Sequence, residues 1–338
     1  MSSPARRERR GPIASRWEGE GQASAIGPSP FPLCCAKRAA VLSRFTGEDE
    51  RRTMTRTLPL LTVTLAIIIL WYLACIPMNA VLTTPKIAAA GGGFANTLAF
   101  SWNEVRPVLP SPHQVMREIW NTVFAVEPWA IKSLVYHLWI TLSSTLVGFV
   151  MGGLLGILLA IGIVHVGSLE KSLMPWVIAS QTIPILAIAP MLIVVLGKTG
   201  LPDIVTKASI SAYLCFFPVT IGMVKGLRSP DVMQQDLMRT YNASSAQTLW
   251  KLRLPASLPF LFASLKVSVA IALTGAIVAE LPTGAVAGIG ARLLNGSYYG
   301  NTLQIWAALF VAAFAAAMMV WALGAMERLS RARMGARP

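Results

Sequence analysis

Long runs of apolar residues are the feature that most limits what this chain can fold into. A helix needs about 20 mostly apolar residues to cross the hydrocarbon core of a bilayer, and we expect six such stretches. They cover residues 58–76, 133–163, 172–196, 204–224, 260–281 and 303–325. All six are predicted to be helices, because backbone polar groups in lipid must find hydrogen-bond partners within the segment. The predicted fold class is therefore an all-α membrane protein.

Composition supports this class and narrows the choice of partner. Of the 338 residues, 54% are hydrophobic and only 13% are charged, which indicates a multi-pass membrane protein and not a soluble enzyme. The net charge of +14 would suit a nucleic-acid partner, but the placement of the basic residues argues against one. They gather between the fourth and fifth stretches and after the sixth, which are cytoplasmic positions by the positive-inside rule. These residues are Arg228, Arg239, Lys251, Arg253, Arg328, Arg331, Arg333 and Arg337.

The same rule predicts the orientation of the chain. Arg51, Arg52 and Arg56 precede the first stretch, so both termini, including a basic tail at 326–338, are expected on the cytoplasmic side. An even number of spans requires this arrangement. The loops assigned to the outside, 197–203 and 282–302, hold one basic residue each.

The N-terminal residues 1–53 differ from the rest of the chain. They are rich in Arg, Gly, Pro and Ser and contain no apolar run long enough for a signal peptide or a span. Such a segment cannot bury enough surface to fold alone. We expect it to be disordered or a mis-annotated gene start, with Met54 as the native initiator and 54–76 as the first membrane helix.

Residues 77–132 are predicted to form an external segment. The glycines at 91–93 indicate a flexible link, and the prolines within 109–112 indicate a rigid lead into an amphipathic surface helix. The apolar residues of this helix are Val115, Ile119 and Val123.

The second stretch carries a small residue at every fourth position, namely Gly148, Gly152, Gly156 and Ala160. Small residues let helix backbones approach closely in lipid, where no hydrophobic drive brings helices together. Packing inside the bundle is the favoured interpretation, and a subunit interface is the alternative.

The third stretch combines prolines with polar residues. Pro175, Pro184 and Pro190 are expected to kink the helix. Gln181 and Thr182 lie at mid-depth, where a polar side chain must face protein or a water-filled path. They either line the route of a solute or bond a neighbouring helix.

Glu280, at the end of the fifth stretch, is the remaining polar candidate. It could cap a re-entrant turn, pair with Arg292 or line an external gate, and the structural roles are favoured. The candidate path residues are thus Gln181, Thr182, Pro184 and Glu280.

Residues 227–259 form a polar segment between the fourth and fifth stretches. Ser229 is expected to cap a first short helix, whose apolar stripe recurs every four residues. Asn242 is expected to end it, because Asn tolerates the left-handed conformation found at helix termini. The stripe consists of Met233, Leu237 and Tyr241.

A second short helix is predicted to follow. Ser244 and Gln247 have the spacing of a capping box, which places the start near Ser245. Pro255 disfavours helical geometry at Leu254, so the helix should stop or bend there. The segment is therefore predicted to be a helix, a hinge and a helix, and an ordinary amphipathic loop on the membrane surface is the alternative.

This spacing resembles the cytoplasmic loop of binding-protein-dependent ABC importer permeases. Their pattern is Glu-Ala-Ala, three residues, Gly, nine residues, Ile, one residue and Leu-Pro. The corresponding residues are Asp236, Leu237, Met238, Asn242, Leu252, Leu254 and Pro255. Asp replaces Glu, Leu-Met replaces Ala-Ala and Asn replaces Gly. Two further stretches, 109–112 and 278–290, are similar to stretches of permeases of the nitrate, sulfonate and taurine type. The resemblance therefore covers about residues 105–326.

The resemblance implies a type I ABC importer permease fold in a bacterial inner membrane, with a core at 133–325. It also implies partners: a second copy in a homodimer surrounded by membrane lipid, two ATPase subunits that carry ATP and Mg²⁺, and a periplasmic or lipid-anchored binding protein. The substrate would be a small anion or organic nutrient.

Motifs for other functions are absent from the sequence. Gly197-Lys198-Thr199 imitates the end of a P-loop, but the first glycine of that motif is replaced by Leu192. The Cys and His residues lack metal-ligand spacing, so no enzyme activity, metal or cofactor is expected in this chain. An ion-coupled secondary transporter is the alternative, and it is disfavoured because the stretches contain few ionisable residues. A membrane enzyme is a third and weaker possibility.

Overall fold

The computed structural model describes the backbone of residues 33–282 and 287–333 and the side chains of residues 58–282 and 287–333. These residues contain helices and no strand, which confirms the all-α class. The chain divides into two compact units, residues 1–65 and 66–338. The helix α1 (Leu33–Ala89) begins in the first unit and continues into the second. It includes residues 33–53, for which composition predicts disorder, and residues 1–32 lie outside the described part. The start at Met54 stays a prediction.

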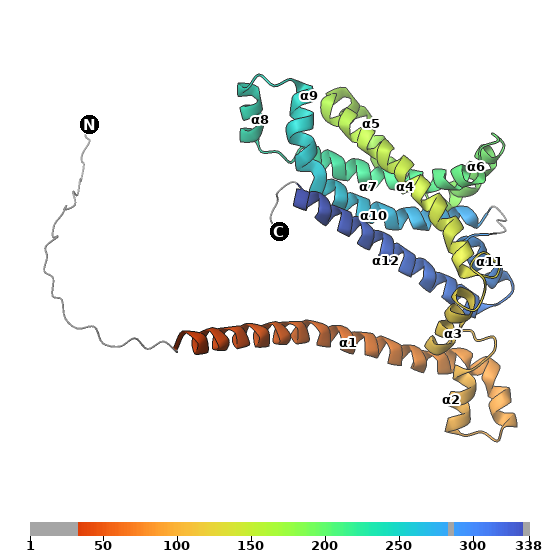
Figure 1. Cartoon of the computed structure of the whole chain (residues 1–338). Coiled ribbons are helices and arrows are strands. Elements are labelled where there is room, and N and C mark those ends of the chain that lie inside the picture. The colour runs from red at the N-terminus through yellow and green to blue at the C-terminus, as the bar shows by residue number, and fades with distance from the viewer. Residues whose placement is uncertain (1–32, 283–286, 334–338) are drawn as a thin grey trace, which may run out of the picture. The chain divides into compact units, whose positions relative to one another are not determined.

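The remaining helices follow in the order shown in Figure 1. They are α2 (Phe94–Trp102), α3 (Pro112–Val123), α4 (Leu134–His165), α5 (Gly167–Ala179), the 3₁₀ turn η1 (Ser180–Thr182), α6 (Ile185–Gly197), α7 (Asp203–Leu227), α8 (Val232–Thr240), α9 (Ser245–Thr248), the π-helical turn η2 (Leu249–Arg253), α10 (Leu254–Glu280), α11 (Ile289–Tyr298) and α12 (Thr302–Arg333). In the described residues, five helical stretches are long and apolar enough to span a membrane, and a bent pair makes up to six.

The bent pair corrects the third predicted span. A single helix over 172–196 is wrong, because the stretches Gly167–Thr182 and Ile185–Gly197 meet at an angle of 102°. Pro184 has no backbone N–H, and it holds Ile183 in an extended conformation (φ −81°, ψ 123°). The hydroxyl of Tyr213 donates to the carbonyl of Ser180 at 2.7 Å and so stabilises the break. Pro184 therefore breaks the helix, where a kink was predicted, while Pro175 and Pro190 lie within α5 and α6.

The segment after the first span is more ordered than predicted. The helix α1 continues to Ala89, 13 residues past the expected end at 76. The glycines at 91–93 have φ values of 86°, 71° and 101°, and they turn the chain into α2. The amphipathic helix is confirmed as α3, with a capping box formed by Ser111 and Gln114.

Asn79 connects the end of α1 to the segment that follows it. Its buried amide donates to the carbonyls of Ser101 and Leu109, and its oxygen accepts from the backbone N–H groups of Val108 and Leu109. One side chain thus joins α1 to the end of α2 and to the loop before α3. No pattern in the sequence marked Asn79 for this role.

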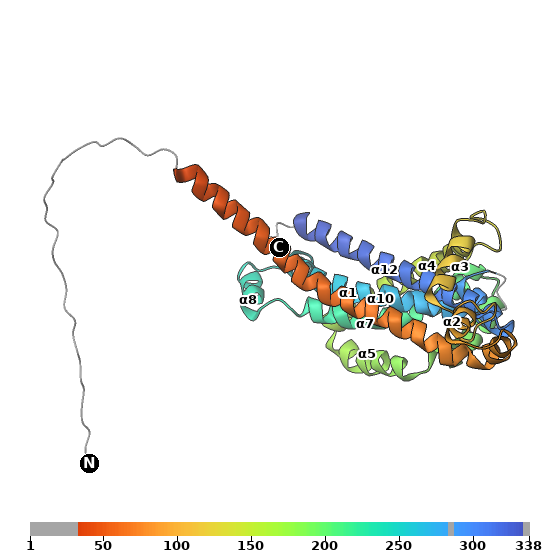
Figure 2. The same cartoon turned by 90° about the horizontal axis from the view of Figure 1, so that it is seen from below.

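The core of the second unit is built around α7, which packs against both α4 and α10. The two views in Figures 1 and 2 show these helices running side by side. The small residues of α4 face α7 closely. A Cβ atom added at Gly148 would lie 2.5 Å from the carbonyl oxygen of Ala208, and one at Gly152 would lie 2.5 Å from that of Ala212. The interpretation as packing inside the bundle is confirmed.

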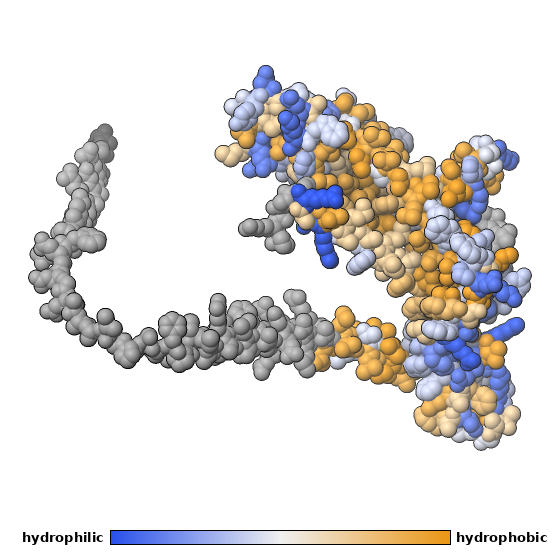
Figure 3. All heavy atoms as spheres, in the orientation of Figure 1, coloured by the Kyte–Doolittle hydropathy of each residue, from blue (hydrophilic) through white to orange (hydrophobic). Residues whose placement is uncertain are grey.

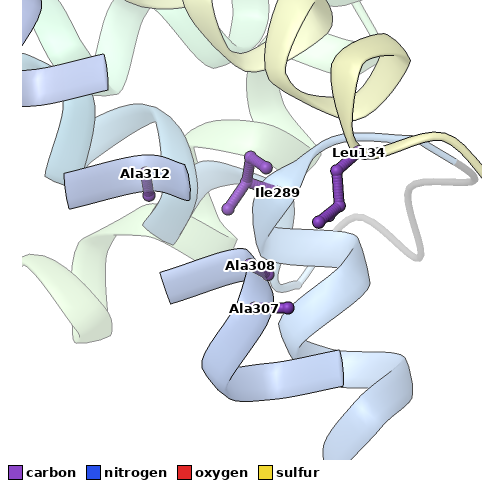
Figure 4. Close-up of a cluster of buried hydrophobic side chains, with 5 residues drawn as sticks. All are labelled: Leu134, Ile289, Ala307, Ala308 and Ala312. Carbon is purple, nitrogen blue, oxygen red and sulfur yellow. The ribbon is translucent and has the colours of Figure 1, made fainter. Parts of the chain in front are cut away.

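The helix surfaces match a lipid environment. Figure 3 shows hydrophobic residues over the middle of the helices and hydrophilic ones around α8 and α9. At the opposite end of the bundle, a cluster of buried side chains from α4, α11 and α12 forms a small core (Figure 4). Its members are Leu134, Ile289, Ala307, Ala308 and Ala312. Because the interior holds many small residues, close backbone packing replaces a large hydrophobic core.

We predict that Gly152→Ala destabilises the protein while the adjacent Gly153→Ala does not. A methyl group at Gly152 would collide with α7, which costs roughly 1–3 kcal/mol. At Gly153 the nearest neighbouring atom, in Leu265, is 3.9 Å away, so the Ala side chain fits there. Chemical unfolding in detergent micelles measures the difference. Equal stability of the two variants would contradict the close α4–α7 contact.

Candidate functional site

The polar segment between α7 and α10 folds into the two short helices that its sequence predicts. Asp231 caps α8: its carboxylate accepts from the N–H of Val232 at 2.7 Å, and Gln234 completes a capping box. The prediction that Ser229 caps this helix is wrong, because the Ser229 hydroxyl donates to the carbonyl of Gly226 at the end of α7. An ionised cap suits the positive end of the helix better than a hydroxyl.

Asn242 makes the connection between the two helices rigid. It has φ 50°, the one positive φ among the described non-glycine residues, as predicted for a helix terminus. The N–H of Asn242 donates to the carbonyl of Arg239 at 2.9 Å, and that of Ala243 to the carbonyl of Met238 at 3.0 Å. These two bonds form a Schellman motif. The predicted hinge is therefore a hydrogen-bonded turn.

The second helix starts as predicted and ends much later than predicted. A capping box of Ser244 and Gln247 begins α9 at Ser245. The helix does not stop at Leu254. It continues through the π turn η2 into α10, and Pro255 lies in the first turn of α10. The wider π turn accommodates the missing N–H and the ring of proline, which a regular helix interior would not. The loop is consequently continuous with a membrane span.

The first short helix differs from η2 and the start of α10 in what covers its apolar residues. Leu249 and Leu254 pack against a cluster at the ends of α4 and α7. By contrast, Met233, Leu237 and Tyr241 are 80%, 56% and 77% exposed, and we call these three residues the apolar stripe. Exposed apolar surface flanked by charges marks interaction sites.

The other predicted loop residues lie in α8, η2 and the start of α10. Asp236 is exposed and pairs with Arg239 at 3.2 Å. Met238 and Leu252 are half-buried, and Pro255 is exposed. Beside the loop, Arg228 pairs with Glu170 of α5 at 2.7 Å. The hydrogen bond to the Glu170 carboxylate raises the pKa of the Arg228 guanidinium above its ordinary value.

The break between α5 and α6 exposes the other polar candidates. Gln181 and Thr182 lie in η1, Pro184 follows, and all three are exposed. The Gln181 side chain makes no hydrogen bond to another described residue. A small apolar pocket of about 240 Å³ lies between α6 and the end of α10, close to this break. The structure thus leaves the break residues exposed.

Glu280 lies elsewhere, fully buried at the end of α10. Three consecutive backbone N–H groups at the start of α11 each find a side chain. Gly288 donates to Nδ1 of His137 at 2.9 Å, Ile289 to the hydroxyl of Thr141 at 2.8 Å, and Gly290 to Oε2 of Glu280 at 2.7 Å. Thr141 also donates to Oε1 of Glu280 at 2.8 Å. We call these six residues the α11 anchor.

The chemistry of the α11 anchor is specific. His137 accepts at Nδ1, so its proton is on Nε2, which donates to the carbonyl of Ile131 at 2.8 Å. Gly288 has φ 133°, and a Cβ atom there would lie 2.3 Å from the Glu280 carboxyl carbon. Arg292 donates instead to the carbonyl of Lys132. Of the roles considered for Glu280, the structure therefore supports the capping of a turn.

Sequence reasoning did not find His137 or Thr141. Each is separated from its partner in the α11 anchor by about 140–150 positions, namely 151 for His137 and Gly288 and 139 for Thr141 and Glu280. A lone histidine in an apolar helix resembles any buried polar residue. Among the described residues, no group of three or more His, Cys, Asp or Glu side chains could hold a metal ion.

Comparison with known proteins assigns this architecture. Residues 152–335 match the family of binding-protein-dependent transport system inner membrane components. The chain belongs to this family. It is a membrane-spanning permease subunit of an ABC importer. The match includes the loop with the apolar stripe and the break, while His137 and Thr141 precede it.

Individual relatives agree with the family. The chain is 30% identical to the riboflavin transport system permease protein RibX of Chloroflexus aurantiacus, over 66% of this chain and 79% of that protein. It is 32% identical to the formylaminopyrimidine transport permease protein ThiX of Halalkalibacterium halodurans, over 51% of this chain and 65% of that protein. It is 24% identical to the taurine transport system permease protein TauC of Escherichia coli, over 65% of this chain and 78% of that protein.

We predict that Thr141→Val destabilises the permease by roughly 2–4 kcal/mol, because a buried carboxylate oxygen and a buried N–H group both lose a partner. Thr145 on the same helix is also buried, but within the described part of the chain its hydroxyl bonds only the local carbonyl of Thr141. The matched variant Thr145→Val should therefore lose less than about 1 kcal/mol. Thermal unfolding of the two purified variants tests this, and equal losses would show that the α11 anchor adds no stability.

Proposed function

We propose that this permease acts as a homodimer driven by two ATPase subunits, which bind the apolar stripe on α8. ATP and Mg²⁺ would be bound by those partners, and this chain would perform no reaction of its own. The observation that carries the proposal is that Met233, Leu237 and Tyr241 form an exposed stripe on a capped helix. An amphipathic helix recognised in a groove presents anchors at this spacing.

The connections of the loop support a role as a lever. The Schellman turn at Asn242 fixes α8 to α9, and the π turn joins α9 to α10 without a gap. Leu249 of η2 and Leu254 of α10 pack on the ends of α4 and α7 and so hold this part of the loop against the bundle. A displacement of α8 by the ATPase would therefore move α10 and, through Glu280, the α11 anchor at its far end. Such coupling requires different contacts in the two states of the permease.

The basic residues around the loop support a cytoplasmic position for α8, with both termini on the same side. The external end of the bundle would then face a periplasmic or lipid-anchored binding protein. The residues of the break, Gln181, Thr182 and Pro184, are proposed to line the solute path, and buried Glu280 to hold the external turn beside it. The named substrates of relatives support a small organic nutrient or anion as cargo, selected by the binding protein.

We predict that Leu237→Asp weakens binding of the ATPase subunit by at least about tenfold, because a charge would be buried in the contact. The control is Leu201→Asp, the same change at an exposed leucine near the other end of α7. Co-purification of the ATPase measures the effect. Undiminished binding of Leu237→Asp would contradict the placement of the contact on the stripe.

A second prediction concerns the path. In a chain whose Cys34 and Cys35 are replaced by Ser, Gln181→Cys should react with a water-soluble thiol reagent, because a thiol needs water to ionise. Trp176→Cys, on the exposed surface of α5, should be shielded by lipid. The native Cys75 and Cys215 are buried and give a low background. Mass spectrometry after labelling in membranes measures the labelled fraction of each variant. Equal labelling of Gln181→Cys and Trp176→Cys would exclude a water path at Gln181.

A further inference from the structure

A polar cavity of about 310 Å³ lies beneath the loop, where α8, α9 and η2 meet the end of α4. Its size would hold a small anionic group with several waters, at about 30 Å³ per water. None of the described residues that line the cavity is acidic. The polar lining residues are His165, Gln235, Arg239, Ser245, Thr248 and Arg253.

Arg253 is the key residue of this cavity. Its Nε atom is buried and has no hydrogen-bond partner among the described residues. A buried cationic donor without a partner is unfavourable, because it has lost its hydration without compensation. Arg253 is presented by the π turn η2, and such turns occur often at functional sites. A buried Nε atom without a partner thus belongs to a residue that lines a polar cavity.

The balance of charge favours an anion there. Arg239 is partly neutralised by Asp236 at 3.2 Å, whereas Arg253 has no ion-pair partner among the described residues. The carbonyl end of α4 also lies at the cavity, with a partial negative charge of about half a unit. A full guanidinium charge outweighs this, so the cavity remains positive.

The cavity is on the face of α8 that the proposed ATPase contact does not use. Gln235 and Arg239 line it, and each lies two residues after a member of the stripe, Met233 and Leu237. Two residues turn a helix by roughly 200°, so the stripe and the cavity are on opposite sides. A partner bound to the stripe would leave the cavity free.

We propose that this cavity binds a phosphate-bearing anion, which bridges α8 and η2 to the end of α4. Guanidinium groups form paired, charge-assisted hydrogen bonds with phosphate oxygens. The phosphate can come from a soluble phosphate or from the headgroup of an anionic lipid, since basic pockets at membrane-helix ends bind such headgroups. A bound anion would satisfy Arg253 and hold the loop against the bundle.

The test uses the full purified chain and two sources of phosphate. In detergent, inorganic phosphate is titrated at constant ionic strength, and Tm is followed by tryptophan fluorescence. In lipid nanodiscs, native mass spectrometry compares retention of phosphatidylglycerol with that of phosphatidylcholine. The variant is Arg253→Gln, and the control is Lys251→Gln, which removes an exposed charge outside the cavity from the same turn. If Arg253→Gln does not fold, Arg239→Gln replaces it.

We expect a saturable rise in Tm with phosphate, or selective retention of phosphatidylglycerol, in the unchanged chain and in Lys251→Gln. Arg253→Gln should weaken the response about tenfold or abolish it. A response to phosphate identifies a soluble anion as a ligand, and one confined to phosphatidylglycerol identifies the headgroup. No response in either arm, or equal loss in both variants, would overturn the proposal. Loss of ATPase binding in Arg253→Gln without any anion response would also overturn it, since a partner side chain would then occupy the cavity.

Discussion

The close approach of α4 and α7 is the contact on which the rest of this permease depends. Lipid gives little hydrophobic drive for two apolar helices to associate, so their packing rests on dispersion contacts between backbones. Gly148, Gly152 and Gly156 permit this contact because they have no side chain. With α4 and α7 held together, α10 packs on α7 and carries the loop at one end and the α11 anchor at the other.

The two ends of α10 illustrate how differently polar groups are used. At the loop end, capping boxes, a Schellman turn and a π turn satisfy the backbone locally, and the apolar stripe is exposed. At the other end, three backbone N–H groups of the turn before and within α11 are satisfied by His137, Thr141 and Glu280 from two different helices. Buried polar groups in such a network are costly to leave unpaired, so the network selects one arrangement of the helices.

Local signals in the sequence predicted much of the loop correctly. Asn242, Ser244 and Gln247 have roles that depend on neighbours within a few residues, and each has the predicted conformation or bond. The errors arose where a local rule had several outcomes. Proline can kink a helix, break it or be absorbed by a wider turn. Pro184 broke the third span, whereas Pro255 was absorbed by η2 and left the helix continuous.

The sequence by itself determined the helical class, the positions of most spans and the stripe on α8, because hydrophobic length and helical periodicity are properties of short segments. Only the tertiary structure decided the 102° break, the partners of Asn79 and Glu280, and the cavity at Arg253. These features join residues far apart in the chain, whose hydrogen bonds and close contacts exist only after the helices have packed. Even the role of the small residues on α4 became definite only when α7 was found against them.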